Sequence, residues 1–186
     1  LASTKKDKEK IYKEIQNYLH NVMSDKVLPA WYGTPWSFNG DAEGPLDGTV
    51  ACGFFVVNVL RNCDFKINPK MALQPSENII KNLIQSEYIK RFSNVSINTL
   101  KDHITKMGEG IFIIGLDSHV GFILNLNGKI RFTHSHAYLF VLSEYPTFSP
   151  TLLRSDYVII GKLFDESMLK KWILNHEFLI TYDYFK

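Results

Sequence analysis

Cysteine is scarce in this sequence. The chain of 186 residues has two cysteines, Cys52 and Cys63, and no C-x-x-C motif. This spacing argues against a zinc site built from thiolates. The two cysteines are eleven positions apart on one expected helix and its end, so their Cα atoms lie beyond the ~7 Å limit of a disulfide. We therefore expect two free thiols.

An excess of charge of one sign and long apolar runs are lacking too. Lys and Arg number 21 and Asp and Glu 19, a net charge of +2 at pH 7. So weak and dispersed a charge argues against a nucleic-acid partner. No apolar stretch approaches the ~20 residues of a membrane span, so we expect none. The 45% hydrophobic and 13% aromatic fractions are ample for the core of one domain.

The spacing of apolar residues predicts helices first and an antiparallel sheet afterwards, which is the α+β class. Asn127-Gly128 between two apolar segments predicts a β-hairpin. The expected helices cover residues 5–23, 52–62, 76–87, 96–107 and 166–175. The expected strands cover 111–116, 119–126, 129–134 and 157–164, with 178–184 either a last strand or an extended tail. Long connections are expected at 28–48 and 135–156.

We expect a single domain over residues 1–186, acting as a monomer. Its parts are an N-terminal helix through residue 27, a core over 28–164, and a C-terminal helix and tail over 165–186.

Cys52 stands where a thiol becomes reactive. A polar loop, residues 44–49, precedes it, and the apolar residues after it predict a buried helix that begins close to Cys52. The positive partial charge of a helix N-terminus favours thiolate and can lower a cysteine pKa from ~8.5 to 7 or below. The alternative is a small buried hydrophobe without chemistry.

Two histidines offer a base for this thiol. His119 begins an otherwise apolar strand, and His134 ends the strand that pairs with it across the Asn-Gly turn. A hairpin places the start of one strand beside the end of the next, so the two imidazoles should be neighbours. Together with Cys52 they predict a Cys-His-His triad.

The other histidines allow different interpretations. His134 and His136 share one face of a strand, and with His119 or Cys52 they could bind zinc. No carboxylate or second cysteine falls at ligand spacing, so we expect no metal and interpret His136 as a surface residue. The remaining histidines lie in helical segments and are expected at the surface or at helix ends: His20, His103 and His176.

Five short motifs, in order, resemble the NlpC-type papain-like cysteine peptidases. That family typically has Gly-Thr-Pro-Tyr-x-x-Gly-Gly, Asp-Cys-Ser-Gly-Phe, His-Val-Gly-Ile-Tyr, Gly-Asn-Gly and Phe-x-His. The resemblance covers residues 33–134 and implies a papain-like fold with the nucleophile helix packed on the sheet. Ala51, Gly53 and Trp36 depart from the pattern and indicate a divergent member. The matching segments are GTPWSFNG (33–40), CGFFV (52–56), HVGFI (119–123), NG (127–128) and FTH (132–134).

The resemblance implies a role for each site residue. Cys52 would be the nucleophile, His119 the general base and His134 the group that orients it. Trp36 stands where the family has an oxyanion-side tyrosine, and its indole N–H can donate but not accept. The backbone N–H of Cys52 would be the other oxyanion donor, and Ser118, beside the base, is assigned to substrate binding. Loop packing is the alternative for the aromatic residues Trp31, Tyr32 and Trp36.

The implied activity is hydrolysis of amide bonds through a thioester, without a cofactor. Family members commonly cut peptidoglycan stem peptides, often between γ-D-glutamyl and a diamino acid, so the expected partner is such a peptide. The chain begins at Leu1 instead of methionine, which we interpret as trimming or processing, with any targeting segment outside it. The resemblance implies an exported bacterial protein, periplasmic or extracellular. The alternatives are a deamidase, an acyltransferase, which a dry apolar groove would favour, and a non-catalytic wall-binding or interaction module.

Overall fold

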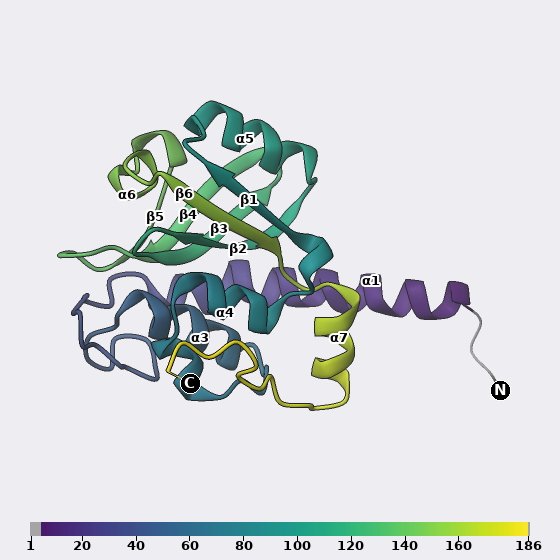
Figure 1. Cartoon of the computed structure of the whole chain (residues 1–186). Coiled ribbons are helices and arrows are strands. Elements are labelled where there is room, and N and C mark those ends of the chain that lie inside the picture. The colour runs from purple at the N-terminus through teal and green to yellow at the C-terminus, as the bar shows by residue number, and fades with distance from the viewer. Residues whose placement is uncertain (1–4, 186) are drawn as a thin grey trace.

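A six-stranded antiparallel sheet is the centre of the protein, and the predicted α+β class is confirmed (Figure 1). The computed structural model describes residues 5–185. The spatial order of the strands is β1-β6-β2-β3-β4-β5, and every adjacent pair is antiparallel. The strands are β1 (Ile89–Ser93), β2 (Gly110–Leu116), β3 (Val120–Leu126), β4 (Lys129–Ser135), β5 (Val141–Glu144) and β6 (Tyr157–Lys162).

Helices cover both faces of this sheet. In Figure 1, α1, α3, α4 and α7 lie on one side, and α5 and α6 lie on the other. The α-helices are α1 (Lys5–Val22), α2 (Leu28–Trp31), α3 (Cys52–Asn62), α4 (Ser76–Leu83), α5 (Ile97–Lys106), α6 (Pro150–Leu153) and α7 (Glu166–Ile173). Shorter turns are the π-helical η1 (Met23–Val27) and the 3₁₀ segments η2 (Pro69–Leu73), η3 (Ser86–Tyr88) and η4 (Pro146–Phe148). Among the described residues, no helix has the length and apolar character that a membrane crossing requires.

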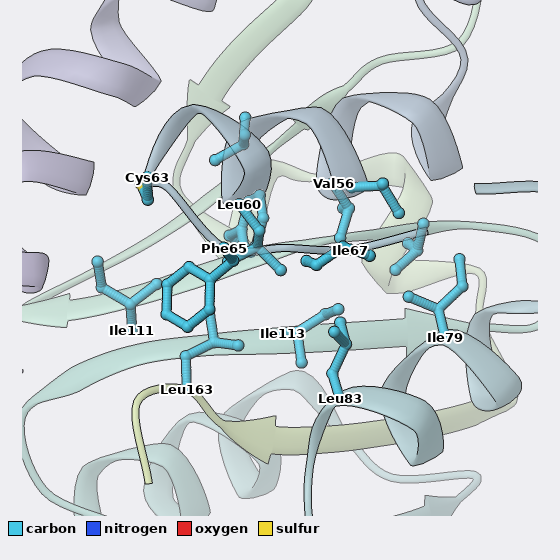
Figure 2. Packing of buried hydrophobic residues seen from close by; sticks show 14 of the residues in the cluster. Val56, Leu60, Cys63, Phe65, Ile67, Ile79, Leu83, Ile111, Ile113 and Leu163 are labelled. Carbon is cyan, nitrogen blue, oxygen red and sulfur yellow. The ribbon is translucent and has the colours of Figure 1, made fainter. Parts of the chain in front are cut away.

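Two apolar clusters hold the layers together, one on each face of the sheet. The larger cluster packs the α3 side chains Val56 and Leu60 over the sheet, with Ile113 of β2 below them (Figure 2). Phe55 of α3 meets Phe122 of β3 edge-on, with ring centroids 5.7 Å apart. This packing fixes α3 on the strands that end at the site. The smaller cluster lies under α5 and includes Leu100, Ile104, Phe112, Ile123 and Phe132.

The N-terminal helical region is longer than predicted. The expected helix over 5–23 is α1, and residues 1–4 lie outside the described residues. The chain then stays helical through η1 and α2 to Trp31, so the connection predicted from residue 28 begins only at residue 32. Pro29 does not stop the helix because it occupies the first turn of α2, where its missing N–H is not needed.

The other predicted helices are present with altered ends. Ser96 caps α5 by accepting a hydrogen bond from the Thr99 amide, as its position predicted. The prediction that a helix runs from 76 to 87 is wrong at its end. α4 stops at Leu83 because Ile84 turns to an extended conformation and is buried.

All four predicted strands exist, and the Asn127-Gly128 turn joins β3 to β4. Both turn residues have positive φ, 52° and 69°, as a tight hairpin of this type requires. Two edge strands were missed. β1 has Lys90, Arg91 and Ser93 exposed, and such polar edges hide the alternating pattern. β5, α6 and η4 lie inside the connection that the sequence predicted over 135–156.

Residues 178–184 are an extended tail and not a further strand of the sheet. Phe178 forms an isolated parallel bridge to Ile67. Further along, the Asn82 side chain accepts hydrogen bonds from the Thr181 and Tyr182 amides. Gln74 accepts one from the Tyr184 amide at 2.8 Å. The tail is therefore tied to the segment that follows η2.

Candidate active site

Cys52 is the first residue of α3, and backbone contacts from distant segments fix its position. Ala51 donates to the Gly40 carbonyl at 2.8 Å, and Val50 donates to the Pro35 carbonyl at 2.9 Å. From β4, the buried Ser135 hydroxyl donates to the Val50 carbonyl at 2.7 Å. The end of β4, which carries His134, is therefore tied to the start of the helix that carries Cys52.

The helix start leaves amides near the thiol. Ala51 is the N-cap, and within the described residues no side chain caps α3. Burial raises the pKa of Cys52, and hydrogen bonding from the backbone N–H groups of Val120, Gly53 and Cys52 offsets only part of this effect. Burial therefore outweighs the effect of the helix terminus, which by itself favours a thiolate.

His119 and His134 are neighbours, as the hairpin predicted. Nε2 of His119 lies 2.8 Å from Nδ1 of His134, and both residues are buried. The strand register pairs Phe122 with Thr133, so Gly121 and His134 each lie one residue beyond this pair. A Cβ atom at position 121 would lie 2.8 Å from the His134 Cβ, so only glycine leaves the room that the His134 side chain occupies.

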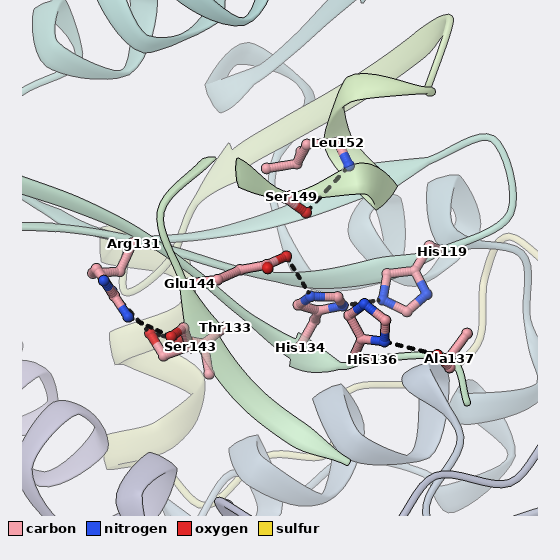
Figure 3. A network of polar contacts seen from close by, with 10 residues as sticks. All are labelled: His119, Arg131, Thr133, His134, His136, Ala137, Ser143, Glu144, Ser149 and Leu152. Atoms are coloured by element: carbon pink, nitrogen blue, oxygen red, sulfur yellow. Dashed lines mark hydrogen bonds and ion pairs between the residues drawn. The ribbon is translucent and has the colours of Figure 1, made fainter. Parts of the chain in front are cut away.

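Glu144 of β5 extends this pair and was missed by the sequence analysis. Its Oε1 lies 3.1 Å from Nε2 of His134, on the side away from His119 (Figure 3). The His134 ring stacks on Phe132, with centroids 4.1 Å apart, and is fully buried. The signal for Glu144 lay in the pairing of β5 with β4, which local periodicity did not reveal.

Burial dominates the electrostatics of the three groups. It lowers the pKa of His119 to about 3, with a further contribution from the positive charge that His134 and His136 can carry. Burial also lowers the pKa of His134, against the opposing effect of Glu144. For Glu144, burial would raise the pKa, but hydrogen bonds from His134 and Ser149 outweigh it and lower the pKa. At neutral pH the site therefore holds uncharged imidazoles and an ionised carboxylate.

Two cavities meet at Cys52. The first has a volume of about 440 Å³ and the second about 460 Å³, and Cys52 and His119 line both. These volumes are in the range of small-molecule and peptide sites. Polar residues of the first cavity include Gln74, Ser76, Glu77, Asp117 and Tyr157. Apolar residues of the second include Trp36, Phe38, Phe54, Leu73 and Ala137.

The two predicted substrate residues both reach this cleft. Ser118 is exposed and lines both cavities beside His119. Trp36 lines the second cavity, where its backbone N–H donates to the Leu139 carbonyl and its ring packs on Tyr138. Trp31, in contrast, is fully buried and donates its indole N–H to Asn62, so the packing interpretation is confirmed for that residue.

The structure explains why glycine stands at position 53, where the family pattern has serine. A Cβ atom there would lie 2.2 Å from the carbonyl oxygen of Ala72 in η2. Ala72 lines both cavities together with Cys52. The η2 segment therefore forms a wall of the cleft at the position that a serine side chain would otherwise occupy.

The predictions for the other histidines and for a metal site can be compared with the structure one by one. His136 is half-buried, with Nδ1 2.7 Å from the Ala137 carbonyl, so its prediction as a surface residue is only partly correct. Within residues 5–185, no group of three His, Cys, Asp or Glu side chains is arranged to hold a metal ion. His103 and His176 are exposed and His20 lies in the last turn of α1, as the prediction of surface or helix-end positions allowed. His20 is half-buried, however, and its Nε2 is buried without a hydrogen-bond partner in the described chain.

Both cysteines are free, as predicted. Cys63 is buried at the end of α3, and burial raises the pKa of its thiol to about 12. It is therefore an unreactive thiol within the same chain.

Comparisons with known proteins give no relative for this chain. No family model, no curated protein and no solved structure matches it. The chemistry of the site therefore has to be argued from its own geometry.

Proposed function

We propose that this protein is a cysteine amidase or peptidase, a divergent member of the NlpC-type papain-like group. The observation that carries the proposal is the placement of Cys52 and His119 on the same two cavities, with His119 hydrogen-bonded to a buried second histidine. A thiol at a helix start, a base beside it and a group that orients the base are the parts that acyl transfer requires.

The proposed reaction begins with the uncharged pair. The Cys52 thiol gives its proton to Nδ1 of His119 while the sulfur attacks the amide carbonyl carbon. The carbonyl becomes an oxyanion, for which the backbone N–H groups at the start of α3 and the Trp36 indole are the proposed donors. His119 then returns the proton to the amine nitrogen as the C–N bond breaks, which leaves a thioester on Cys52.

Water completes the cycle. His119 accepts a proton from a water molecule that attacks the thioester, and Cys52 leaves with that proton as a thiol. The products are a carboxylic acid and an amine. Peptidoglycan stem peptides are the leading substrate class, carried by the motif resemblance, and such a substrate places the protein in the periplasm or outside the cell.

The apolar second cavity favours a second candidate function. Trp36, Phe54 and Leu73 line it close to Cys52, and an apolar acceptor bound there would take the acyl group in place of water. Hydrolysis in heavy-oxygen water puts one labelled oxygen into the acid product, whereas acyl transfer puts none. Mass spectrometry of the product distinguishes the two reactions.

The direct test is digestion of purified muropeptides, followed by mass spectrometry. We expect the protein to release fragments of lower mass and Cys52→Ala to abolish release. Cys63→Ala, which alters the buried thiol, is the matched control and should retain activity. Undiminished cleavage by Cys52→Ala would contradict the proposed nucleophile, and unchanged muropeptide masses would contradict the proposed substrate.

A further inference from the structure

Glu144 is placed to decide which way the histidine pair carries its protons. Its carboxylate accepts hydrogen bonds and cannot donate them while ionised. The contact at 3.1 Å from its Oε1 therefore requires the proton on Nε2 of His134. The Glu144 side chain is 20% exposed and the His134 side chain fully buried, so this contact is the outer end of the network.

The position of the His134 proton in turn fixes that of His119, because Nδ1 of His134 lies 2.8 Å from Nε2 of His119. An uncharged His134 with its proton on Nε2 has only a lone pair at Nδ1. That lone pair faces Nε2 of His119, so His119 must carry its own proton on Nε2. The second nitrogen of His119, Nδ1, is then unprotonated. Nε2 of His119 is occupied by His134, and His119 lines the same cavities as Cys52, so Nδ1 is the nitrogen left to accept the thiol proton.

The opposite arrangement would disable the base. If His134 carried its proton on Nδ1, His119 would have to accept at Nε2 and would hold its proton on Nδ1. A protonated Nδ1 cannot take a proton from Cys52. The direction of two hydrogen bonds therefore decides whether His119 can act as a base. Each histidine nitrogen can donate or accept, but the ionised Glu144 carboxylate can only accept, so Glu144 sets the direction of both bonds.

We propose that Glu144 is a positioning residue that, through His134, holds His119 in the tautomer with a free Nδ1. The proposal rests on the proposed function, because the free nitrogen matters only if Cys52 is a nucleophile. Ser149 is buried, hydrogen-bonds the Glu144 carboxylate and accepts a hydrogen bond from the Leu152 amide. The segment of η4 and α6 therefore helps to hold this carboxylate in place. The 135–156 segment thus has a role in the site through Glu144 and Ser149.

Nitrogen NMR of histidine-labelled protein tests the assignment without any substitution. At neutral pH, we expect the wild-type His119 to show a protonated Nε2 and an unprotonated Nδ1. His134 should likewise be protonated at Nε2. A His119 ring protonated at Nδ1 would overturn the proposal.

Two variants then test the role of Glu144. Glu144→Gln keeps the shape but lets the amide donate or accept, so we expect a mixture of His119 tautomers. Glu144→Leu removes the acceptor, so the His119 proton should move to Nδ1. Iodoacetamide labelling of Cys52 at pH 7 should slow about tenfold or more in Glu144→Leu, part of the ~10²–10⁴-fold that a general base contributes. In Glu144→Gln it should slow only in proportion to the His119 fraction that loses its free Nδ1, about twofold for an even mixture. Glu14→Gln, an exposed carboxylate on α1, is the control and should change neither readout.

Unchanged tautomers and an unchanged labelling rate in both variants would overturn the role of Glu144. That result would leave the proposed function standing if Cys52→Ala still abolished muropeptide cleavage. The converse result, with correct tautomers but a dispensable Cys52, would overturn the function and leave the hydrogen-bond assignment intact.

Discussion

The resting site is uncharged at its reactive residues. Burial raises the pKa of Cys52 and lowers that of His119 to about 3, so a thiol faces an imidazole at neutral pH. A preformed thiolate–imidazolium pair would require both buried groups to be charged before substrate arrives. We therefore expect the proton to leave the thiol as the sulfur attacks, with His119 as a general base.

Gly53 gives a prediction at the level of one residue. Gly53→Ser would make the chain more like the family it resembles, yet its Cβ would collide with the Ala72 carbonyl at 2.2 Å. Because backbone must move, we expect the free energy of unfolding to fall by about 1–3 kcal/mol. Chemical denaturation measures this loss, and muropeptide cleavage should fall with it, since η2 lines the cleft.

Gly44→Ser is a control for this substitution. A Cβ atom at Gly44 would lie 3.9 Å from the Asp47 Cβ, an ordinary contact, and Gly44 is not among the glycines with a left-handed φ. If Gly53→Ser were as stable as the wild type, the η2 backbone at Ala72 would be able to move aside at little cost. The contact of η2 with Gly53 would then not fix the shape of the cleft.

At the level of elements, the sequence predicted the site where local pattern and pairing agree. The Asn127-Gly128 turn defined the β3–β4 hairpin, and the hairpin brought His119 to His134. The sequence analysis missed Glu144 because its strand, β5, has only four residues and lies within a long connection. Its pairing with β4 depends on contacts such as Arg131 with Ser143, which no periodicity encodes.

For Trp36, the sequence predicted the position but not the surroundings. Its place in the second cavity results from backbone pairing of the 33–36 segment with residues 139–141, about one hundred positions later in the chain. The motif resemblance predicted that Trp36 would reach the site, and the structure agrees. That Phe54 and Leu73 line the same cavity as Trp36 could not be predicted, because η2 approaches α3 only in the folded chain.

For the molecule as a whole, buried histidines predict loss of stability in acid. Burial, and next the charge of Lys162, lowers the pKa of His20 to about 4. The unfolded state binds a proton near pH 6.5 and the folded state only near pH 4. The stability that uncharged His20 contributes is therefore complete above pH 6.5 and is lost as the pH falls toward 4.

His20→Leu tests this account. It removes the buried Nε2, which has no hydrogen-bond partner in the described chain. The decrease in unfolding free energy between pH 7.5 and pH 5 should therefore shrink by about 1 kcal/mol, half of the ~2 kcal/mol that the two pKa values alone give, because a half-buried group is partly screened by solvent. Urea denaturation at the two pH values measures it. His176→Leu, at an exposed histidine, should leave the decrease unchanged. An equal decrease in wild type and His20→Leu would show that His20 does not contribute to acid sensitivity.

The central claim is that His119 activates Cys52, and site-resolved alkylation tests it most directly. Iodoacetamide labelling at pH 7, followed by peptide mass spectrometry, gives separate rates for Cys52 and the buried Cys63. We expect Cys52 to react at least about tenfold faster than Cys63, and His119→Ala to slow Cys52 by ~10²-fold, whereas His103→Ala has no effect. A Cys52 rate that is the same with and without His119 would contradict the claim.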